Sequence, residues 1–503
     1  MLWSRRRVLV AGLGAVATVA TGCQVDRGAT PSGSTGTGPG EPAGSSGGRV
    51  SIPQTSLAEK IEAFLIAPDV NSAAFLALDM GASGDVGWVP YLVDLLRLAG
   101  EEEGIEQILI ALQKLTGRYV LNDVGVAFVE YGGWVLEEQP EPAPGYLRWK
   151  ATLYGRIDPS FAIILYGMAG AGMSTTDTAR LLSEIHWGGV IRGGIPELNR
   201  PRRVGAQQPE AGYLRDDELV FGVSVQGVAV AYPERILGYH ELANDVIGGT
   251  GVIASYCPLC RSARAFRAEG RTMQSSGLLR SSNKLMVARV PVSDTSAVSD
   301  PADPADLAGI TLWQQINGEA LSGPERSSRL TPLEMETLTW LEWRTRHPST
   351  EVLVRPDPAQ FPSTSYRYEP QESYRTYDAD SGAWFPVLKP PGNLDLKATV
   401  ATVVSGDATL AIDVAALARA GPSIIAWAGS LVELILAVPS PSGARLYDAT
   451  GLRLTPGPVS NLARSDDQTA VLSDGTSLAR LPSGRAVWFA WYAEHRTTTW
   501  WPT

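Results

Sequence analysis

Apolar residues recur at helical spacing through the first part of the chain, from residue 55 to about residue 185. In the segment SLAEKIEAFLIA, four apolar residues fall on one helical face: Leu57, Ile61, Phe64 and Leu65. Ser56 precedes them and is suited to cap the helix. The stretch VPYLVDLLRLAGEEEGIEQILIALQKLTG predicts two further amphipathic helices on either side of Gly100–Gly104. We therefore expect a helical domain over residues 55–185, which packs on the rest of the chain or binds a protein partner.

The pattern changes at about residue 190, where β-branched runs punctuated by glycine replace the helical spacing. The runs ELVFGVSVQGVAVAYP and GTGVIASYC are typical of strands. The segment between them, ERILGYHELANDVIGG, predicts a short helix on which His240 and Asn244 share a face. The chain as a whole therefore predicts an α+β fold, in which a helical N-terminal domain precedes a β-rich body.

The β-rich body contains an internal repeat. Residues 338–353 (LTWLEWRTRHPSTEVL) match residues 486–501 (AVWFAWYAEHRTTTWW). Three aromatic positions coincide in the two segments: Trp340, Trp343 and His347 fall on Trp488, Trp491 and His495. We expect two related halves, 186–370 and 371–503, of which the second is degenerate and carries no cysteine. Because the Trp-x-x-Trp-x-x-x-His element recurs in the half without cysteines, we interpret it as a core-packing helix rather than a ligand site.

The start of the chain is typical of an exported bacterial lipoprotein. A basic Arg5–Arg7 precedes an apolar run, Val8–Ala20, which is too short to span a bilayer comfortably and indicates a signal peptide over residues 1–23. The run ends in Ala-Thr-Gly-Cys, which resembles a lipobox whose Cys23 becomes lipidated, and SRRRVL resembles a twin-arginine export motif. Residues 24–54 are rich in Gly, Ser and Pro and predict a flexible linker. We expect an extracytoplasmic protein that is attached to the cell membrane through a lipid on Cys23.

Composition and charge narrow the classes of partner. The chain is 44% hydrophobic and 19% charged, as in globular proteins. Its net charge is −11 and no block of Lys or Arg follows the signal, which argues against nucleic acid as a partner. Beyond the signal, the most apolar stretch, SIIAWAGSLVELILAVP, is interrupted by Glu433 and is too short for a membrane helix.

Beyond Cys23, the chain has two cysteines, Cys257 and Cys260, in the segment ASYCPLCRSARAF. Three interpretations are open. The pair forms a structural disulfide, since the expected compartment is oxidising. Alternatively, it exchanges electrons as a redox dithiol, although the following residues indicate a turn and a strand rather than the helix of thioredoxin-type sites. In the third, the two thiolates bind copper or zinc together with His240 and Met286.

Several polar residues near the pair in sequence are candidates for supporting roles: Glu241, Asn244, Asp245, Tyr256, Ser276 and Asn283. In a metal site, Glu241 or Asp245 would orient His240. In a redox dithiol, His240 would adjust the pKa of the reactive thiol, while Asn283 and Ser276 would line the site. A further alternative is a non-enzymatic binding protein, in which the only role of the disulfide is to stabilise a turn. In that protein a cleft between the halves, lined by Trp313 and Gln315, would capture a ligand or partner.

The body carries a series of short motifs in a fixed order. In chain order they are Gly194-Ile195-Pro196, Tyr232-Pro233, His240-Glu241, Asn244-Asp245, Tyr256 to Cys260, Ser276-Gly277-Leu278, Asn283, Met286, Trp313-Gln314-Gln315 and His347-Pro348. This order resembles the bacterial domain of unknown function family 3179, over about residues 190–503. The resemblance implies a secreted or membrane-anchored bacterial protein and assigns no reaction to it. Outside the Gly/Ser/Pro-rich stretch 24–54, the chain also lacks the G-x-S-x-G, H-E-x-x-H and Walker signatures of common enzymes.

Overall fold

The computed structural model describes residues 56–98, 104–120, 123–169, 173–289, 310–361, 366–368, 374–429, 431–466, 468–481 and 483–502. The predicted signal peptide, the linker and the lipidation candidate Cys23 lie outside these residues. No helix in the described part of the chain is long and apolar enough to cross a membrane.

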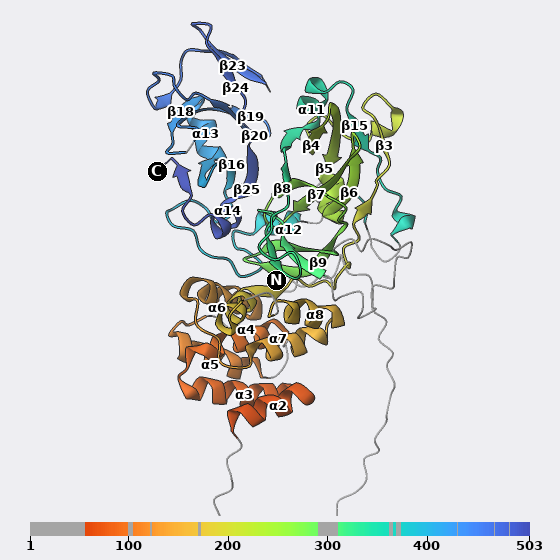
Figure 1. Ribbon diagram of the computed structural model, residues 1–503. Coiled ribbons are helices and arrows are strands. Elements are labelled where there is room, and N and C mark those ends of the chain that lie inside the picture. The colour runs from red at the N-terminus through yellow and green to blue at the C-terminus, as the bar shows by residue number, and fades with distance from the viewer. Residues whose placement is uncertain are drawn as a thin grey trace, which may run out of the picture.

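The N-terminal region folds into stacked helices (Figure 1). They are α2 (Leu57–Ile66), α3 (Val70–Ser83), η1 (Val86–Trp88), α4 (Val89–Leu98), α5 (Ile105–Thr116), α6 (Val124–Glu138), α7 (Tyr146–Gly155), α8 (Pro159–Gly167) and α9 (Thr175–Ser183). The predicted cap at Ser56 is present and forms a capping box with Glu59, which satisfies free N–H groups of the first turn. Of the stacked helices, α2 and α3 lie farthest from the β-rich body (Figure 1).

The first half of the body contains three five-stranded sheets. One has the order β1-β9-β10-β11-β12, built from Ile185–Trp187, Met273–Arg280, Asn283–Arg289, Ile310–Gln314 and Ala320–Ser322. The next has the order β13-β8-β7-β6-β2, built from Pro332–Leu333, Ser262–Arg267, Thr250–Cys257, Leu242–Ile247 and Leu198–Asn199. The last has the order β14-β4-β5-β15-β3, built from Met335–Thr339, Leu219–Val225, Val228–Pro233, Glu351–Leu353 and Arg203–Gly205. Short helices accompany these strands: η2 (Pro209–Ala211), α10 (Glu234–His240), α11 (Trp340–Arg346) and η4 (Pro358–Gln360). Helix α12 (Arg375–Ala379) follows them at the start of the second half.

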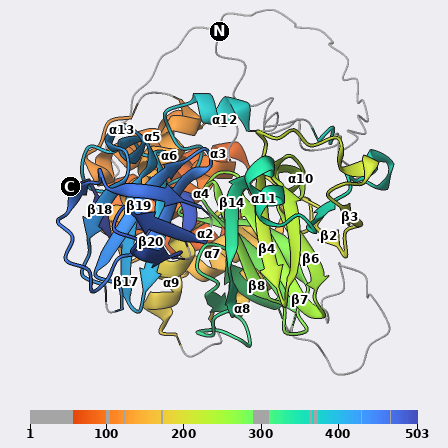
Figure 2. The same cartoon turned by 90° about the horizontal axis from the view of Figure 1, so that it is seen from above.

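The second half has two four-stranded sheets and a three-stranded sheet. The first, β25-β16-β17-β26, is built from Gly484–Val487, Thr399–Ser405, Ala408–Asp413 and Thr499–Trp501. The second, β20-β19-β18-β21, is built from Gly443–Asp448, Leu434–Ser440, Ser423–Ala426 and Gly457–Pro458. The third, β22-β23-β24, is built from Leu462–Ser465, Thr469–Leu472 and Ser477–Ala479. The helices are α13 (Val414–Ala420) and α14 (Trp488–Glu494). The two halves lie side by side over the helical domain (Figures 1 and 2).

The two halves share a strand order. The sheet β14-β4-β5-β15 of the first half corresponds to β25-β16-β17-β26 of the second, and in both the third and fourth strands pair in parallel. The repeated aromatic element forms the short helices α11 and α14. In these helices Trp343 lies 4.1 Å from His347 and Trp491 lies 3.9 Å from His495, measured between ring centroids. The prediction of a helical domain followed by a β-rich body of two related halves is confirmed.

One local prediction is wrong. The segment expected as a single helix is helical only over α10, and its remainder forms strand β6. The change occurs at Glu241, whose φ of 58° is left-handed and ends the helix directly after His240. Asn244 and Asp245 therefore lie on a strand, and Asn244 shares no helical face with His240.

Candidate functional site

The two cysteines lie at the tip of the β7–β8 hairpin. Cys257 is the last residue of β7 and pairs with Ser262, the first residue of β8. The four residues between them form a turn in which the Cys260 amide donates a hydrogen bond of 3.1 Å to the Cys257 carbonyl. Arg261 completes the turn with a φ of 46°. This geometry brings both side chains to one side of the hairpin.

The two sulfur atoms are close together and buried. Their separation is 2.6 Å, and the structure records both cysteines as free thiols. Cys257 is 1% exposed and Cys260 is 0% exposed. Burial, followed by the neighbouring Cys257, raises the pKa of Cys260 well above its ordinary value. No helix begins at this turn, so no helix dipole favours a thiolate.

A second hairpin tip, between β9 and β10, contacts Cys260. The Cys260 thiol donates to the side-chain oxygen of Asn283 at 3.1 Å and lies 3.4 Å from the carbonyl oxygen of Ser282. Ser281 and Ser282 both have positive φ, as in the tight two-residue turns of β-hairpins. The Asn283 amide in turn donates to the Ala490 carbonyl of the second half at 3.5 Å. The structure thus places Asn283 in contact with Cys260.

Residues from the later part of the chain also hold the cysteine turn. The Val487 amide donates to the Cys260 carbonyl at 2.8 Å, and the Tyr377 hydroxyl donates to the Leu259 carbonyl at 3.0 Å. Arg261 forms an ion pair with Asp378. These partners carry no motif of their own, and sequence reasoning missed them. They make the cysteine turn a junction between the two halves.

A buried ion pair lies next to the thiols. Lys284 Nζ is 3.1 Å from the carboxylate of Glu241, and the Tyr374 hydroxyl donates to the same carboxylate at 3.1 Å. The Lys284 amine also donates to the Glu241 carbonyl at 3.1 Å. Burial and then the Glu241 charge raise the pKa of Tyr374 well above its ordinary value, and Cys257 adds to this effect. Glu241, proposed from the sequence to orient a metal ligand, is instead paired with Lys284.

His240 is not directed at the cysteines. Its Nδ1 lies 2.7 Å from the Pro196 carbonyl and its Nε2 lies 2.7 Å from the Tyr368 hydroxyl. The ring also packs against Phe361, at 4.6 Å between centroids. Burial lowers the pKa of His240 to about 4, so the ring is neutral at pH 7. Because both nitrogens are engaged, the prediction of His240 as a metal ligand or as a tuner of the thiolate is not supported by this geometry.

Met286 lies on the other face of its sheet. Its neighbours Leu285 and Val287 belong to the apolar cluster that contains both cysteines, while Met286 packs with Trp313 in a separate cluster. Side chains alternate along a strand, so Met286 cannot share the face of Leu285. It therefore does not approach the sulfurs as a further ligand.

A metal ion does not fit the thiol pair as it stands. Two thiolates that share one tetrahedral zinc ion lie about 3.8 Å apart, from Zn–S bonds of about 2.3 Å. The observed sulfurs are closer, at 2.6 Å. Among the residues that the structure describes, no group of three or more His, Cys, Asp or Glu side chains is arranged to hold a metal. Copper or zinc binding stays a prediction, without the ligands expected for it.

The other predicted neighbours form hydrogen bonds between strands, or between a strand and helix α10, rather than touching the sulfurs. The Asn244 side chain bonds both backbone groups of Met273, at 2.9 Å each. The other predicted residues also form hydrogen bonds. The Tyr232 hydroxyl donates to the Asp245 carboxylate at 2.7 Å, and the Tyr256 hydroxyl donates to the Glu234 carboxylate at 2.7 Å. The Ser276 hydroxyl donates to the Leu285 carbonyl at 2.7 Å.

Trp313 and Gln315 do not line an open cleft, because both are fully buried. Gln315 fixes the base of the cysteine turn instead. Its amide donates to the Ser262 carbonyl at 3.1 Å, and its carbonyl accepts from the Ser262 hydroxyl at 3.0 Å. The expectation of a cleft lined by these two side chains is therefore wrong.

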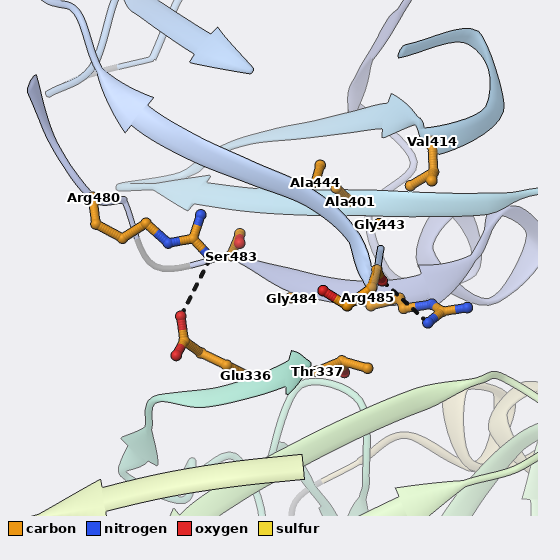
Figure 3. Close-up of a pocket in the computed structure, with 11 residues that line it drawn as sticks. Glu336, Thr337, Ala401, Val414, Gly443, Ala444, Arg480, Ser483, Gly484 and Arg485 are labelled. Atoms are coloured by element: carbon orange, nitrogen blue, oxygen red, sulfur yellow. Dashed lines mark hydrogen bonds and ion pairs between the residues drawn. The ribbon is translucent and has the colours of Figure 1, made fainter. Parts of the chain in front are cut away.

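A small pocket does lie between the halves (Figure 3). Residues of both halves line it: Glu336, Thr337, Ala401, Val414, Ser442, Gly443, Ala444, Arg480, Ser483, Gly484 and Arg485. Across it, Arg480 of the second half pairs with Glu336 of the first half at 3.3 Å. The pocket borders the β19–β20 turn, the counterpart of the cysteine turn. At that turn the hydroxyls of Ser440 and Ser442 lie 3.2 Å apart.

Comparison with known proteins yields one match. A family model described as "Protein of unknown function (DUF3179)" matches residues 192–296 and 304–498. No curated protein matches the chain, and no solved structure does.

Proposed function

The chain belongs to the DUF3179 family of proteins of unknown function, and from its own residues we propose that it is a membrane-anchored, extracytoplasmic scaffold protein whose cysteine pair has a structural role. In this proposal the signal over residues 1–23 directs export, and Cys23 carries the lipid. Cys257 and Cys260 form a disulfide that fixes the junction between the two halves. An oxidising compartment favours such a bond.

The observation that carries the proposal is the pair of buried sulfurs 2.6 Å apart. A disulfide has an S–S bond of about 2.05 Å, so a small movement suffices to form it. Its formation removes two protons and two electrons, which pass to a thiol oxidant of the compartment. The turn that would be closed is already bound to Val487 of the second half, so the bond would stabilise an interdomain contact.

Burial argues against a thiol-exchange catalyst. Such a catalyst presents an accessible thiolate, because the thiolate is the attacking group. Cys260 is buried, and its pKa is raised by that burial. A reductant would reach the bond only after the junction had opened. We therefore favour a bond that forms once and persists.

A redox-active dithiol is the second candidate, and one observation favours it. The reduced Cys260 thiol has two acceptors in place, the side-chain oxygen of Asn283 and the Ser282 carbonyl. Acceptors of this kind stabilise the reduced form relative to the disulfide. A disulfide across so short a loop also gains little from chain entropy. Both features would raise the reduction potential of the pair.

The test is a thiol and metal count on the mature protein purified without reductant. After denaturation, a maleimide mass shift counts free thiols, and elemental analysis counts copper and zinc. The control is the Cys257→Ser/Cys260→Ser variant. No free thiol and no metal is the expected result, with a reduction potential below about −300 mV for a structural bond. A higher potential would favour the redox dithiol, and a metal lost in the variant would overturn both candidates. Cys23→Ala, which should abolish lipid attachment, tests the anchor separately.

A further inference from the structure

Helix α3 has two apolar faces. One face is packed in the core of the helical domain, where Leu76, Ala77 and Met80 are buried. The other face points to solvent, with Phe75 70% exposed and Leu78 42% exposed.

The solvent-facing residues form a continuous stripe. Phe75, Leu78 and Ala82 follow a spacing of three and four residues, which places them in a row on one side of the helix. The helix carries one charged residue, Asp79, and this side chain pairs with Lys60 of α2. The α3 stripe, residues Phe75, Leu78 and Ala82, contains no charged residue, and the partly exposed Asp79–Lys60 pair lies along its edge.

The position of the α3 stripe in the fold makes it unusual. Helices α2 and α3 form the layer farthest from the β-rich body (Figure 1). The last layer of a helical stack normally has a polar outer face, because nothing else covers it. Apolar side chains grouped on an exposed outer face are typical of a surface that contacts a partner or a membrane.

The chain itself indicates what lies there. Residues 24–55 join Cys23 to Ser56, the cap of α2, so the folded part nearest to Cys23 along the chain is the α2–α3 pair. The linker predicted from the composition of this segment would have an average span of about 30 Å. A lipid on Cys23 would hold this end of the molecule close to the bilayer. At the resulting effective concentration, a weak contact is sufficient.

We propose that the α3 stripe is a docking surface for the lipid bilayer. Phe75 and Leu78 enter the interfacial region, and the helix axis lies along the membrane. The stripe has no basic residue, so apolar burial rather than attraction to anionic headgroups drives the contact. The inference rests on the proposed lipid anchor, since the anchor supplies the proximity.

The experiment places an environment-sensitive dye beside the stripe. Cys257 and Cys260 are buried, so a cysteine introduced by Ala82→Cys can be labelled selectively. The mature chain from residue 24 carries an N-terminal His tag and is tethered to phosphatidylcholine vesicles that contain a nickel-chelating lipid. The control carries the same dye at Leu431→Cys, a site 78% exposed in the second half.

The expected result is a blue shift of the dye at position 82 on tethering, with no shift at position 431. Phe75→Ser/Leu78→Ser should abolish the shift, whereas Val404→Ser, which removes an exposed apolar side chain elsewhere, should not. A dye at position 82 that stays in water overturns the proposal. A blue shift that grows with protein concentration without vesicles also overturns it and assigns the stripe to a second copy. Because the tag replaces the lipid, failure of the Cys23 anchor would leave this result unchanged.

Discussion

The backbone amide of Val487 donates a hydrogen bond of 2.8 Å to the carbonyl oxygen of Cys260. The two residues are far apart in sequence and belong to different halves of the body. Val487 ends strand β25 and precedes helix α14, in the half that has no cysteine. The degenerate half therefore has a direct part in the site: it holds the turn on which the first half carries its thiols.

Tyr377→Phe is expected to loosen the cysteine turn. The variant removes the hydroxyl that donates to the Leu259 carbonyl and leaves that buried carbonyl without its donor. The expected loss is about 1–3 kcal/mol in the free energy of unfolding, measured by urea denaturation. The reduced variant should also react faster with maleimide. Tyr119→Phe, at an exposed tyrosine, is the control and should change neither quantity.

The reduced thiols are expected to react slowly at neutral pH. Burial raises the pKa of Cys260 well above its ordinary value, so the thiolate is scarce until the pH is far above the usual thiol range of about 8.5. Iodoacetamide should modify the native Cys257→Ser variant at least about 100-fold more slowly than the denatured protein at pH 8. Mass spectrometry follows the reaction over time. Equal rates would mean that the site opens readily and would favour the redox dithiol.

Breaking the buried ion pair of the helical domain is expected to lower the free energy of unfolding much more than breaking an exposed ion pair on the same helix. Lys150 Nζ lies 2.8 Å from Asp94, both side chains are fully buried, and Tyr146 also donates to Asp94 at 2.9 Å. Lys150→Met leaves the carboxylate without its cation, at an expected cost of about 3–5 kcal/mol in urea unfolding. Arg148→Met, which breaks an exposed pair on the same helix, should cost less than about 1 kcal/mol. Similar losses in the two variants would contradict the buried pairing.

Arg280 connects all three parts of the molecule. Its guanidinium lies 2.7 Å from Glu184 of the helical domain, 3.1 Å from Gln314, and 3.8 Å from Glu494 of the second half. Arg280→Met should cost about 3 kcal/mol and expose the junction to limited proteolysis, because two carboxylates lose their cation. Arg180→Met, at an exposed pair, is the control. An unchanged digestion pattern would show that the three parts hold together without Arg280.

The features that the sequence predicted correctly depend on local periodicity. The helical spacing of Leu57 and Phe64 indicates a helix independently of the rest of the chain. The Trp–His elements likewise repeat with the same spacing in both halves. The equivalence extends beyond the matched rings. Trp343 donates to Thr350 at 2.9 Å, and Trp491 donates to Thr498 at 3.0 Å. A repeat in sequence therefore predicted a repeat in three dimensions.

The features that the sequence did not predict depend on the directions in which side chains point and on how the two halves pack. His240 and Glu241 are adjacent, yet the left-handed turn at Glu241 sends one to Tyr368 and the other to Lys284, beside the thiols. Strand alternation could have separated Met286 from the cysteine face, had its neighbours Leu285 and Val287 been assigned to that face. No sequence signal marks Tyr377 or Val487, because their contacts with the turn depend on how the halves pack.

His240 is expected to make the protein less stable in acid. Burial lowers its pKa from 6.5 to about 4, and its Nδ1–H can donate to Pro196 while Nε2 accepts from Tyr368. Between these pH values the unfolded chain binds a proton that the folded protein does not. The free energy of unfolding therefore falls as the pH drops from about 6.5 to 4, by about 3 kcal/mol at most from this residue.

Urea unfolding between pH 7 and pH 4.5 measures this slope, and His240→Gln is the matched variant. Glutamine can keep both roles, since its amide can donate to the Pro196 carbonyl and its oxygen can accept from Tyr368, but it does not titrate. The variant should therefore depend less steeply on pH than the wild type, whatever its stability at pH 7. Burial also lowers the pKa of His495 to about 4. The free energy of unfolding of the His240→Gln/His495→Gln protein should therefore depend on pH even less steeply than that of His240→Gln. A slope in His240→Gln equal to that of the wild type would mean that the ring is protonated in the folded protein, and that Tyr368 accepts from it rather than donates.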